Sequence, residues 1–161
     1  MTSLRRHTAL IRVALGYLAV SLGSVGAYIL VAPRSFYDDF PNGLGWVAAL
    51  PPFNEHLLRD FGAAGLGLAI LAALAAVWIE RRLVQAAAIA LFAGTVPHAI
   101  YHSVTADGLA TGDRIGELTL LWLQALLPLA VLYLATGSRQ RPASDRPRPR
   151  WRPRAAREDP S

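Results

Sequence analysis

The sequence predicts an all-α integral membrane protein, a four-transmembrane-helix bundle with an interfacial outer loop and a disordered basic C-terminal tail. The first observation is composition: 53% of the residues are hydrophobic and only 17% are charged, which is too apolar for an ordinary soluble domain. The second is that the apolar residues fall into long blocks, and the third is that arginines cluster between these blocks. We therefore expect one membrane domain over residues 1–137 and a separate tail over residues 138–161.

The first expected span covers about residues 9–31 and follows two basic residues, Arg5 and Arg6. Its roughly 23 residues are enough to cross a hydrocarbon core of about 30 Å as a helix. Four hydroxyl-bearing residues recur on one face of this helix: Tyr17, Ser21, Ser24 and Tyr28. Hydroxyl groups in hydrocarbon are best satisfied against other helices, so this stripe predicts either a helix–helix contact or the wall of a pocket.

A connection over residues 32–53 follows, and it is rich in proline, glycine and aromatic residues. It is longer than a plain hairpin needs, and loops of this length are often functional. Its aromatic side chains suit the interface between water and lipid. We expect a short interfacial helix near Arg34 to Phe40, and we expect the connection to cap the bundle, either as an aromatic anchor or as a lid.

The second and third expected spans cover about residues 56–79 and 83–103. Only Glu80, Arg81 and Arg82 separate them, which forces an antiparallel hairpin. The second span is dense in small residues at i, i+4 spacing, the pairs being Ala63/Gly67 and Gly65/Ala69. Such pairs let membrane helices approach closely, and they leave room for a homo-oligomer. After a polar loop, the fourth span covers about residues 115–136.

The formal charge of +5 belongs to the tail, where eight arginines stand against three acidic residues. Alternating arginine and proline cannot bury a core, so the tail is predicted to be disordered. Its charge suits anionic lipids of the inner leaflet and does not indicate a nucleic-acid-binding fold. The chain contains no cysteine, which excludes disulfides, thiolate catalysis and cysteine-ligated metals.

Arginine placement also predicts the orientation of the spans. The clusters at Arg5/Arg6 and Arg81/Arg82 and the tail fall on one side of the membrane, whereas the other side carries a mixture of basic and acidic residues. Because positive residues are retained on the cytoplasmic side, we expect a multi-pass protein of the cell (plasma) membrane with both termini in the cytoplasm.

Polar chemistry concentrates at two places beside the apolar blocks. Asn54 to Asp60 opens the second span, and Pro97 to His102 closes the third. Counted outward from the Arg81/Arg82 turn, Asp60 and His102 are each about 21 residues away, so they lie level with each other. His56/Asp60 and His98/His102 are both i, i+4 pairs, and each pair shares a helix face. If both faces turn inward, three imidazoles and a carboxylate converge.

Ionisable residues within a membrane are costly and indicate a functional site. The candidate binding residues are Tyr28, Asn54, Glu55, His56, Arg59, Asp60, His98, Tyr101, His102, Glu117 and Gln124. Three interpretations stay open at this point. The residues form a structural network that pins the bundle, or they line a pocket for a small molecule, a quinone or a lipid headgroup, or they serve a metal-dependent membrane enzyme. The candidate ligands for a divalent metal are His56, Asp60, His98 and His102.

Catalytic residues are not evident in the sequence. There is no recognisable nucleophile motif or phosphate-binding glycine loop. Three segments carry a resemblance instead: Phe36 to Pro41, Asn54 to Gly62, and Pro97 to His102 with Asp107 and Gly108. On these segments the chain resembles the DoxX-like group of small bacterial four-helix membrane proteins, and more closely a set of actinobacterial membrane proteins with no assigned activity. The resemblance implies the fold and the membrane location. Because the DoxX-like group is linked to redox subunits, the resemblance also implies a redox role for this chain.

Overall fold

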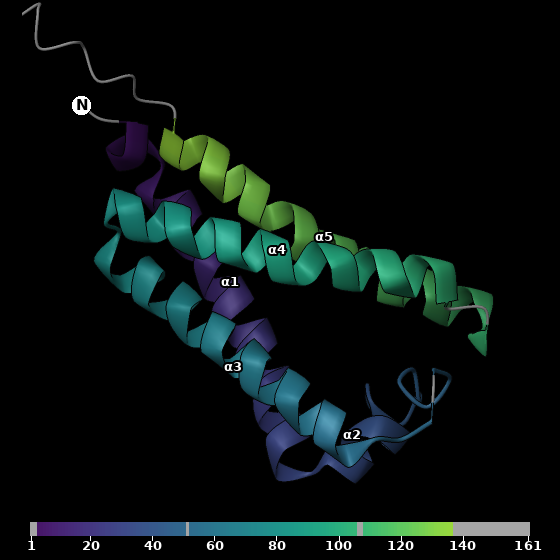
Figure 1. Cartoon of the computed structure of the whole chain (residues 1–161). Helices are drawn as coiled ribbons and strands as arrows, with labels where there is room; N and C mark the ends of the chain where they lie inside the picture. Colours follow the sequence, from purple (N-terminus) through teal and green to yellow (C-terminus); the bar gives the residue numbers. More distant parts are fainter. Residues whose placement is uncertain (1–2, 51, 106–107, 137–161) are drawn as a thin grey trace, which may run out of the picture.

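The computed structural model describes residues 3–50, 52–105 and 108–136, with side chains from His7 onward. Within these ranges the chain is all-helical (Figure 1). The helices are α1 (Ser3–Val31), α2 (Pro33–Asp39), α3 (Glu55–Trp78), α4 (Arg81–Thr105) and α5 (Thr111–Thr136). The tail over residues 138–161 lies outside the described residues.

Four of these helices, α1, α3, α4 and α5, are long and apolar enough to cross a membrane. The prediction of a four-transmembrane-helix bundle is therefore confirmed. The helix bounds agree with the expected spans of residues 9–31, 56–79, 83–103 and 115–136 to within a few residues at most ends. The fourth helix begins earlier, at Thr111, because a helix continues beyond the apolar block as long as polar residues suit it.

The turn between α3 and α4 is as short as the sequence predicts. Ile79 has a left-handed backbone, with φ of 49°, and its N–H donates to the carbonyl of Ala75 at 3.1 Å. A left-handed residue at this position ends a helix by closing its last turn. The chain then reverses through Glu80, and α4 begins at Arg81.

Helix α1 packs closely along α3 through two glycines. A Cβ atom added to Gly26 would lie 2.8 Å from the carbonyl oxygen of Gly62, and one added to Gly62 would lie 2.7 Å from Ile29 Cγ2. The predicted close contact between small residues therefore exists. It uses Gly62, which was not predicted, and Ala69, which was and whose Cβ atom lies 3.4 Å from the Cβ position of Gly23. Gly65 and Gly67 have open space where a Cβ atom would be, because α3 is rotated so that neither glycine meets another helix.

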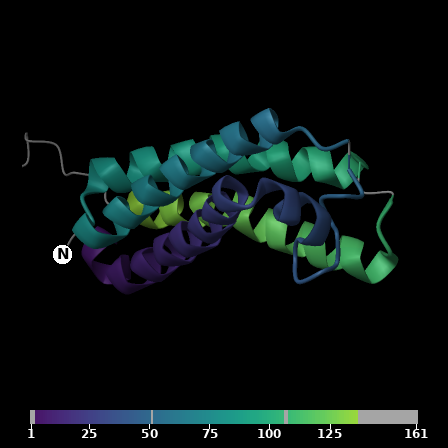
Figure 2. The ribbon, with the colours of Figure 1, turned by 90° about the horizontal axis from the view of Figure 1, so that it is seen from below.

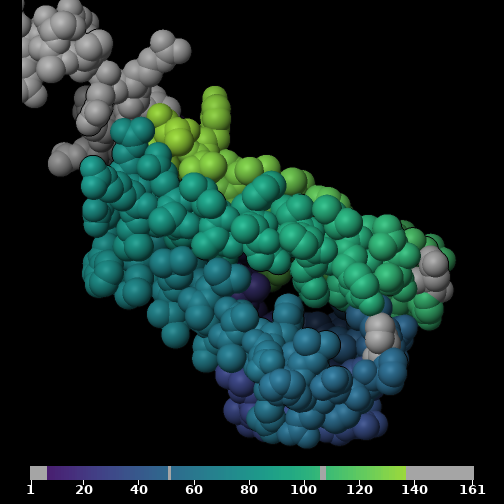
Figure 3. All heavy atoms as spheres, in the orientation of Figure 1, coloured from purple at the N-terminus to yellow at the C-terminus, as the bar shows by residue number. Residues whose placement is uncertain are grey.

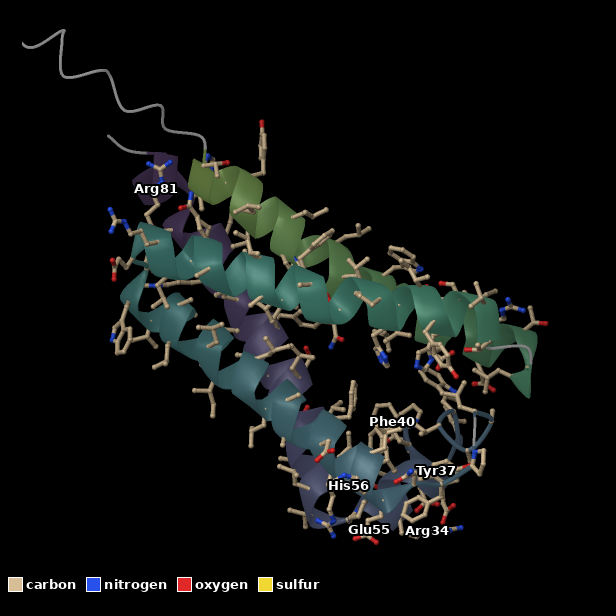
Figure 4. All side chains as sticks on the ribbon, in the orientation of Figure 1. Arg34, Tyr37, Phe40, Glu55, His56 and Arg81 are labelled. Atoms are coloured by element: carbon tan, nitrogen blue, oxygen red, sulfur yellow. The ribbon has the colours of Figure 1, made fainter. Side chains whose placement is uncertain are left out.

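The tightest core lies at the end of the bundle that carries the Arg81 turn (Figure 4). Helix α1 supplies three fully buried side chains to it, namely Ile11, Leu15 and Leu18. From this end, the pair α1/α3 and the pair α4/α5 diverge along their length (Figure 1). Helix α2 and the connection after it lie across the open end (Figure 2).

Helix α2 confirms the short helix predicted near Arg34 to Phe40. It is held to α1 by a hydrogen bond between Tyr28 Oη and Ser35 Oγ at 2.8 Å. Arg34 forms an ion pair with Asp38 at 2.6 Å, and this hydrogen bond raises the pKa of the guanidinium above its ordinary value. The guanidinium also lies 5.0 Å from the ring centroid of Phe53, which ties both ends of the connection together.

Candidate functional site

A cavity of about 820 Å³ lies where the two helix pairs diverge. All four long helices and the connection between α2 and α3 contribute to its walls. Figure 3 shows this face of the molecule hollowed between the atoms of α4 and those of α3 and the connection. The cavity exists because α2 and the connection cover the open end of the bundle without filling the space between the helices.

The cavity walls are mostly apolar. Seven Phe, Tyr and Trp side chains take part, namely Tyr17, Phe36, Tyr37, Phe40, Trp46, Phe61 and Tyr101. Trp46 is the one buried residue among the described residues of the connection between α2 and α3. It is 8% exposed, and a Cβ atom on Gly116 would lie 3.4 Å from Trp46 Cη2, which is an ordinary van der Waals distance. The indole ring therefore packs directly against α5.

A buried histidine–carboxylate pair forms the polar end of the cavity. His102 on α4 and Glu117 on α5 both line it, and they are 7% and 5% exposed. The distance from His102 Nδ1 to Glu117 Oε1 is 2.8 Å. We assign Nδ1 as the donor, because a carboxylate oxygen accepts hydrogen bonds. The pair ties α4 to α5 and keeps the imidazole in a fixed orientation.

Two buried polar atoms of cavity-lining residues have no hydrogen-bond partner. They are Glu117 Oε2 and Trp46 Nε1, and within the described ranges no other buried side-chain nitrogen or oxygen is left unpaired. An unsatisfied buried polar group costs about 1–3 kcal/mol, so each such group calls for a specific explanation, such as a water molecule or a ligand.

His98 lies one turn from His102 on α4 and also lines the cavity. The two imidazole centroids are 4.5 Å apart, and His98 stacks on the Phe61 ring of α3 at 5.2 Å. The face that carries His98 and His102 therefore turns toward the cavity, a rotation that the sequence left open. Tyr101 lines the cavity as well and contacts the His102 ring at a centroid distance of 5.9 Å.

The hydroxyl stripe of α1 serves both roles that the sequence left open. Tyr17, Ser21 and Ser24 line the cavity. Ser21 Oγ also accepts a hydrogen bond from Gln124 Nε2 of α5 at 3.0 Å, so it joins two helices at the cavity wall. Tyr28 is not among the lining residues, because its hydroxyl is bonded to α2.

The segment Asn54 to Asp60 holds the start of α3 and contributes little to the cavity. Asn54 caps the helix by accepting a hydrogen bond from the Leu57 amide at 3.1 Å, and it is the one polar residue of this segment that lines the cavity. Arg59 pairs with Glu55 at 2.8 Å and donates to the Leu30 carbonyl at 2.7 Å. Arg59 thereby satisfies a carbonyl at the end of α1.

His56 and Asp60 face away from the other histidines. Their side chains are 89% and 65% exposed, and they contact each other at 3.4 Å. Figure 4 shows Glu55 and His56 at the outer edge of α3, away from α4. The convergence of three imidazoles with Asp60 therefore does not occur. The rotation of α3, which the sequence left open, turns the His56/Asp60 face outward.

The metal hypothesis needed His56, Asp60, His98 and His102 in one place. They are split between the outer surface of α3 and the cavity face of α4. Across the described parts of the chain, no three His, Asp or Glu side chains are grouped so that they could hold a metal ion. The carboxylate that pairs with His102 is Glu117, a predicted binding residue whose partner the sequence did not indicate.

No protein-family model, curated protein or solved structure matches this chain. The resemblance to DoxX-like proteins therefore stays a prediction.

Proposed function

We propose that this integral membrane protein binds an amphipathic small molecule, such as a quinone or a lipid, in the cavity between its helix pairs. The observation that carries the proposal is a largely apolar cavity of about 820 Å³ that contains two buried, unpaired hydrogen-bonding atoms, Glu117 Oε2 and Trp46 Nε1. A ligand that brings its own polar group would satisfy these atoms, and its apolar body would fill the remaining volume.

The size and lining of the cavity support this function. Small-molecule sites enclose roughly 300–1,000 Å³ and combine apolar walls with a few placed polar groups. Here the imidazole and carboxylate groups, His98, His102 and Glu117, come from α4 and α5, and most of the other lining residues are apolar, with a few neutral polar side chains among them. Apolar walls with a few polar groups suit a molecule that has one polar end and an apolar body.

Access from the bilayer follows from two side chains at the cavity edge. Phe61 on α3 and Tyr101 on α4 both line the cavity, and they are 43% and 45% exposed. Both helices have the length and composition of membrane spans, so these exposed aromatic rings face hydrocarbon. A ligand dissolved in the membrane would enter between α3 and α4 without crossing the aqueous phase.

The test is the mass of what remains bound after purification from native membranes. Gly65 lines the cavity and has open space at its Cβ position, so Gly65→Trp would fill the cavity without a backbone clash. Gly67 lies on the same helix, is exposed and also has open space, which makes Gly67→Trp a matched control. Native mass spectrometry should show a bound molecule in the wild type and in the Gly67→Trp variant. Its persistence in the Gly65→Trp variant would contradict the proposal.

We further propose that the cavity lies in the outer leaflet of the cell membrane and that both termini are cytoplasmic. Arg81 lies at the end of the bundle opposite the cavity (Figure 4), and arginine-rich turns stay in the cytoplasm. A reporter that is active only in the cytoplasm, inserted after Gly108, should be inactive. An active reporter at this position would reverse the orientation.

A further inference from the structure

The charges around the cavity restrict the head group of its ligand, an inference that rests on the proposed function. Among the described residues that line the cavity, none is an arginine or a lysine, whereas Glu117 is a carboxylic acid. The arginines at this end of the bundle are not among the lining residues: Arg34 pairs with Asp38, Arg59 pairs with Glu55 and the Leu30 carbonyl, and Arg114 donates to the Ser103 carbonyl at 3.5 Å. An anionic phosphate would lose its hydration here and meet no positively charged lining residue, which is a costly combination.

The unpaired carboxylate oxygen, Glu117 Oε2, can accept a hydrogen bond from a ligand donor. Glu117 Oε1 already accepts from His102 Nδ1 at 2.8 Å, while Oε2 is buried and has no partner in the described structure. An ionised carboxylate is an acceptor only, and hydrogen bonds to it are stronger than those between neutral groups. A ligand group that carries an O–H or N–H therefore fits this position.

Trp46 distinguishes between ligand groups that donate through an O–H and those that donate through an N–H. Its Nε1–H is buried and unpaired, and it needs an acceptor because indole is a donor only. Its ring packs against Gly116, the residue directly before Glu117, so the indole and the carboxylate both lie beside the first turns of α5. An ammonium group has no lone pair and would leave Trp46 unsatisfied. A hydroxyl group donates and accepts.

We propose that the cavity selects an uncharged amphiphile with a hydroxyl head group, which donates to Glu117 Oε2 and offers its oxygen to Trp46 Nε1. Phenols and long-chain alcohols belong to this class. Phospholipids and ammonium amphiphiles do not belong to it. The His102–Glu117 pair holds the accepting oxygen in place, and the apolar walls take the tail.

The experiment uses four probes that share one decyl tail: 4-decylphenol, its methyl ether 4-decylanisole, decylammonium and decyl phosphate. Binding is measured to the full-length protein in lipid nanodiscs and is corrected for uptake by empty nanodiscs. A hydrogen bond to a charged acceptor predicts that the phenol binds about tenfold to a hundredfold more tightly than its ether. The ammonium and phosphate probes should bind more weakly than the phenol.

Two variants test whether the preference for phenol over ether depends on Glu117 Oε2 and Trp46 Nε1. In Glu117→Gln, the amide oxygen can still accept from His102, but the free position becomes an N–H donor, so the preference for phenol over ether should disappear. Trp46→Phe keeps an aromatic ring and removes the indole donor. It should weaken the phenol and the ether together and leave the ratio between them unchanged. Size-exclusion profiles identical to the wild type confirm that both variants fold.

Equal binding of phenol and ether to the wild type would overturn this inference, as would tighter binding of the ammonium or the phosphate probe. The Gly65→Trp variant separates such a failure from a failure of the proposed function. If Gly65→Trp abolishes binding of all probes but the wild type shows no preference among them, the cavity binds amphiphiles and only the head-group inference fails. If binding is unaffected by Gly65→Trp, or if no probe binds at all, both proposals fail.

Discussion

Two histidine–carboxylate pairs occur at the end of this bundle away from the Arg81 turn, and they differ in almost every physical respect. His56 and Asp60 are four residues apart on α3, 3.4 Å from each other and largely exposed. His102 and Glu117 come from different helices, lie 2.8 Å apart and are buried. Exposed pairs contribute about 0–1 kcal/mol because their charges are screened, whereas a buried group depends on its partner. Proximity in sequence therefore points to the weaker pair.

The largest effect is expected from removing one partner of the buried pair. His102→Ala leaves Glu117 without a hydrogen-bond donor inside the bundle, which should lower the free energy of unfolding by about 3–5 kcal/mol. Reversible unfolding in mixed detergent micelles measures this change. Replacing both partners, as in His102→Leu with Glu117→Met, should recover most of the loss, because apolar side chains of similar volume tolerate such a site. A single variant as stable as the wild type would show that the pair is not structurally important.

A smaller effect is expected from Arg59, which pairs with Glu55 on α3 and also donates a hydrogen bond to the Leu30 carbonyl on α1. Arg59→Met keeps most of the apolar stem and removes the bonds to Glu55 and to the Leu30 carbonyl. Since the guanidinium is half-exposed, we expect a loss of about 1–2 kcal/mol, discounted for solvent screening. The same unfolding measurement applies. Glu55→Gln is the matched control, because it removes the ion pair and leaves the bond to α1, and it should cost less.

Asn54 tests the local contribution of the segment that opens α3. Asn54→Ala removes the side-chain acceptor for the Leu57 amide, and loss of such a cap costs about 1 kcal/mol. Asn54→Asp retains the acceptor and should be close to the wild type in the same unfolding measurement. Equal losses in both variants would indicate that the asparagine acts through the cavity wall and not through the cap.

The smallest effect is expected from the exposed pair. Asp60→Asn should change the free energy of unfolding by less than about 0.5 kcal/mol and should leave binding in the cavity unchanged. His56→Ala should behave in the same way. A large loss of stability or of ligand binding in either variant would mean that this face of α3 is covered in the assembled protein.

The fold was largely predictable from the sequence, because a membrane-spanning helix can be recognised by its length and apolar composition. The short turn at Glu80 to Arg82 predicted an antiparallel hairpin of α3 and α4. Counting residues outward from this turn along both helices predicted that Asp60 and His102 lie at one level. The rotation of α3 was not predictable. In a helix that faces hydrocarbon on one side and apolar neighbours on the other, apolar residues lie all around, so their pattern does not identify the inward face.

Two further features of the site depend on contacts that spacing does not encode. Glu117 meets His102 only because α4 and α5 pack side by side, and these residues are separated by a loop. Trp46 was expected as one of several interfacial aromatic residues, whereas it is inserted beside Gly116 on α5. A tryptophan flanked by glycine in a long connection was the available signal, and the same signal fits a membrane anchor equally well.

The most direct measurement is the site at which a bound amphiphile becomes covalently attached to the protein. A 4-alkylphenol with a diazirine on the carbon next to its ring would be photolysed in nanodiscs, and the labelled residues would be mapped by mass spectrometry. We expect labelling of cavity-lining residues such as Thr95 and Leu121, and its loss in the Gly65→Trp variant. Labelling confined to exposed residues such as Val77 and Leu129 would contradict the existence of a ligand site between the helix pairs.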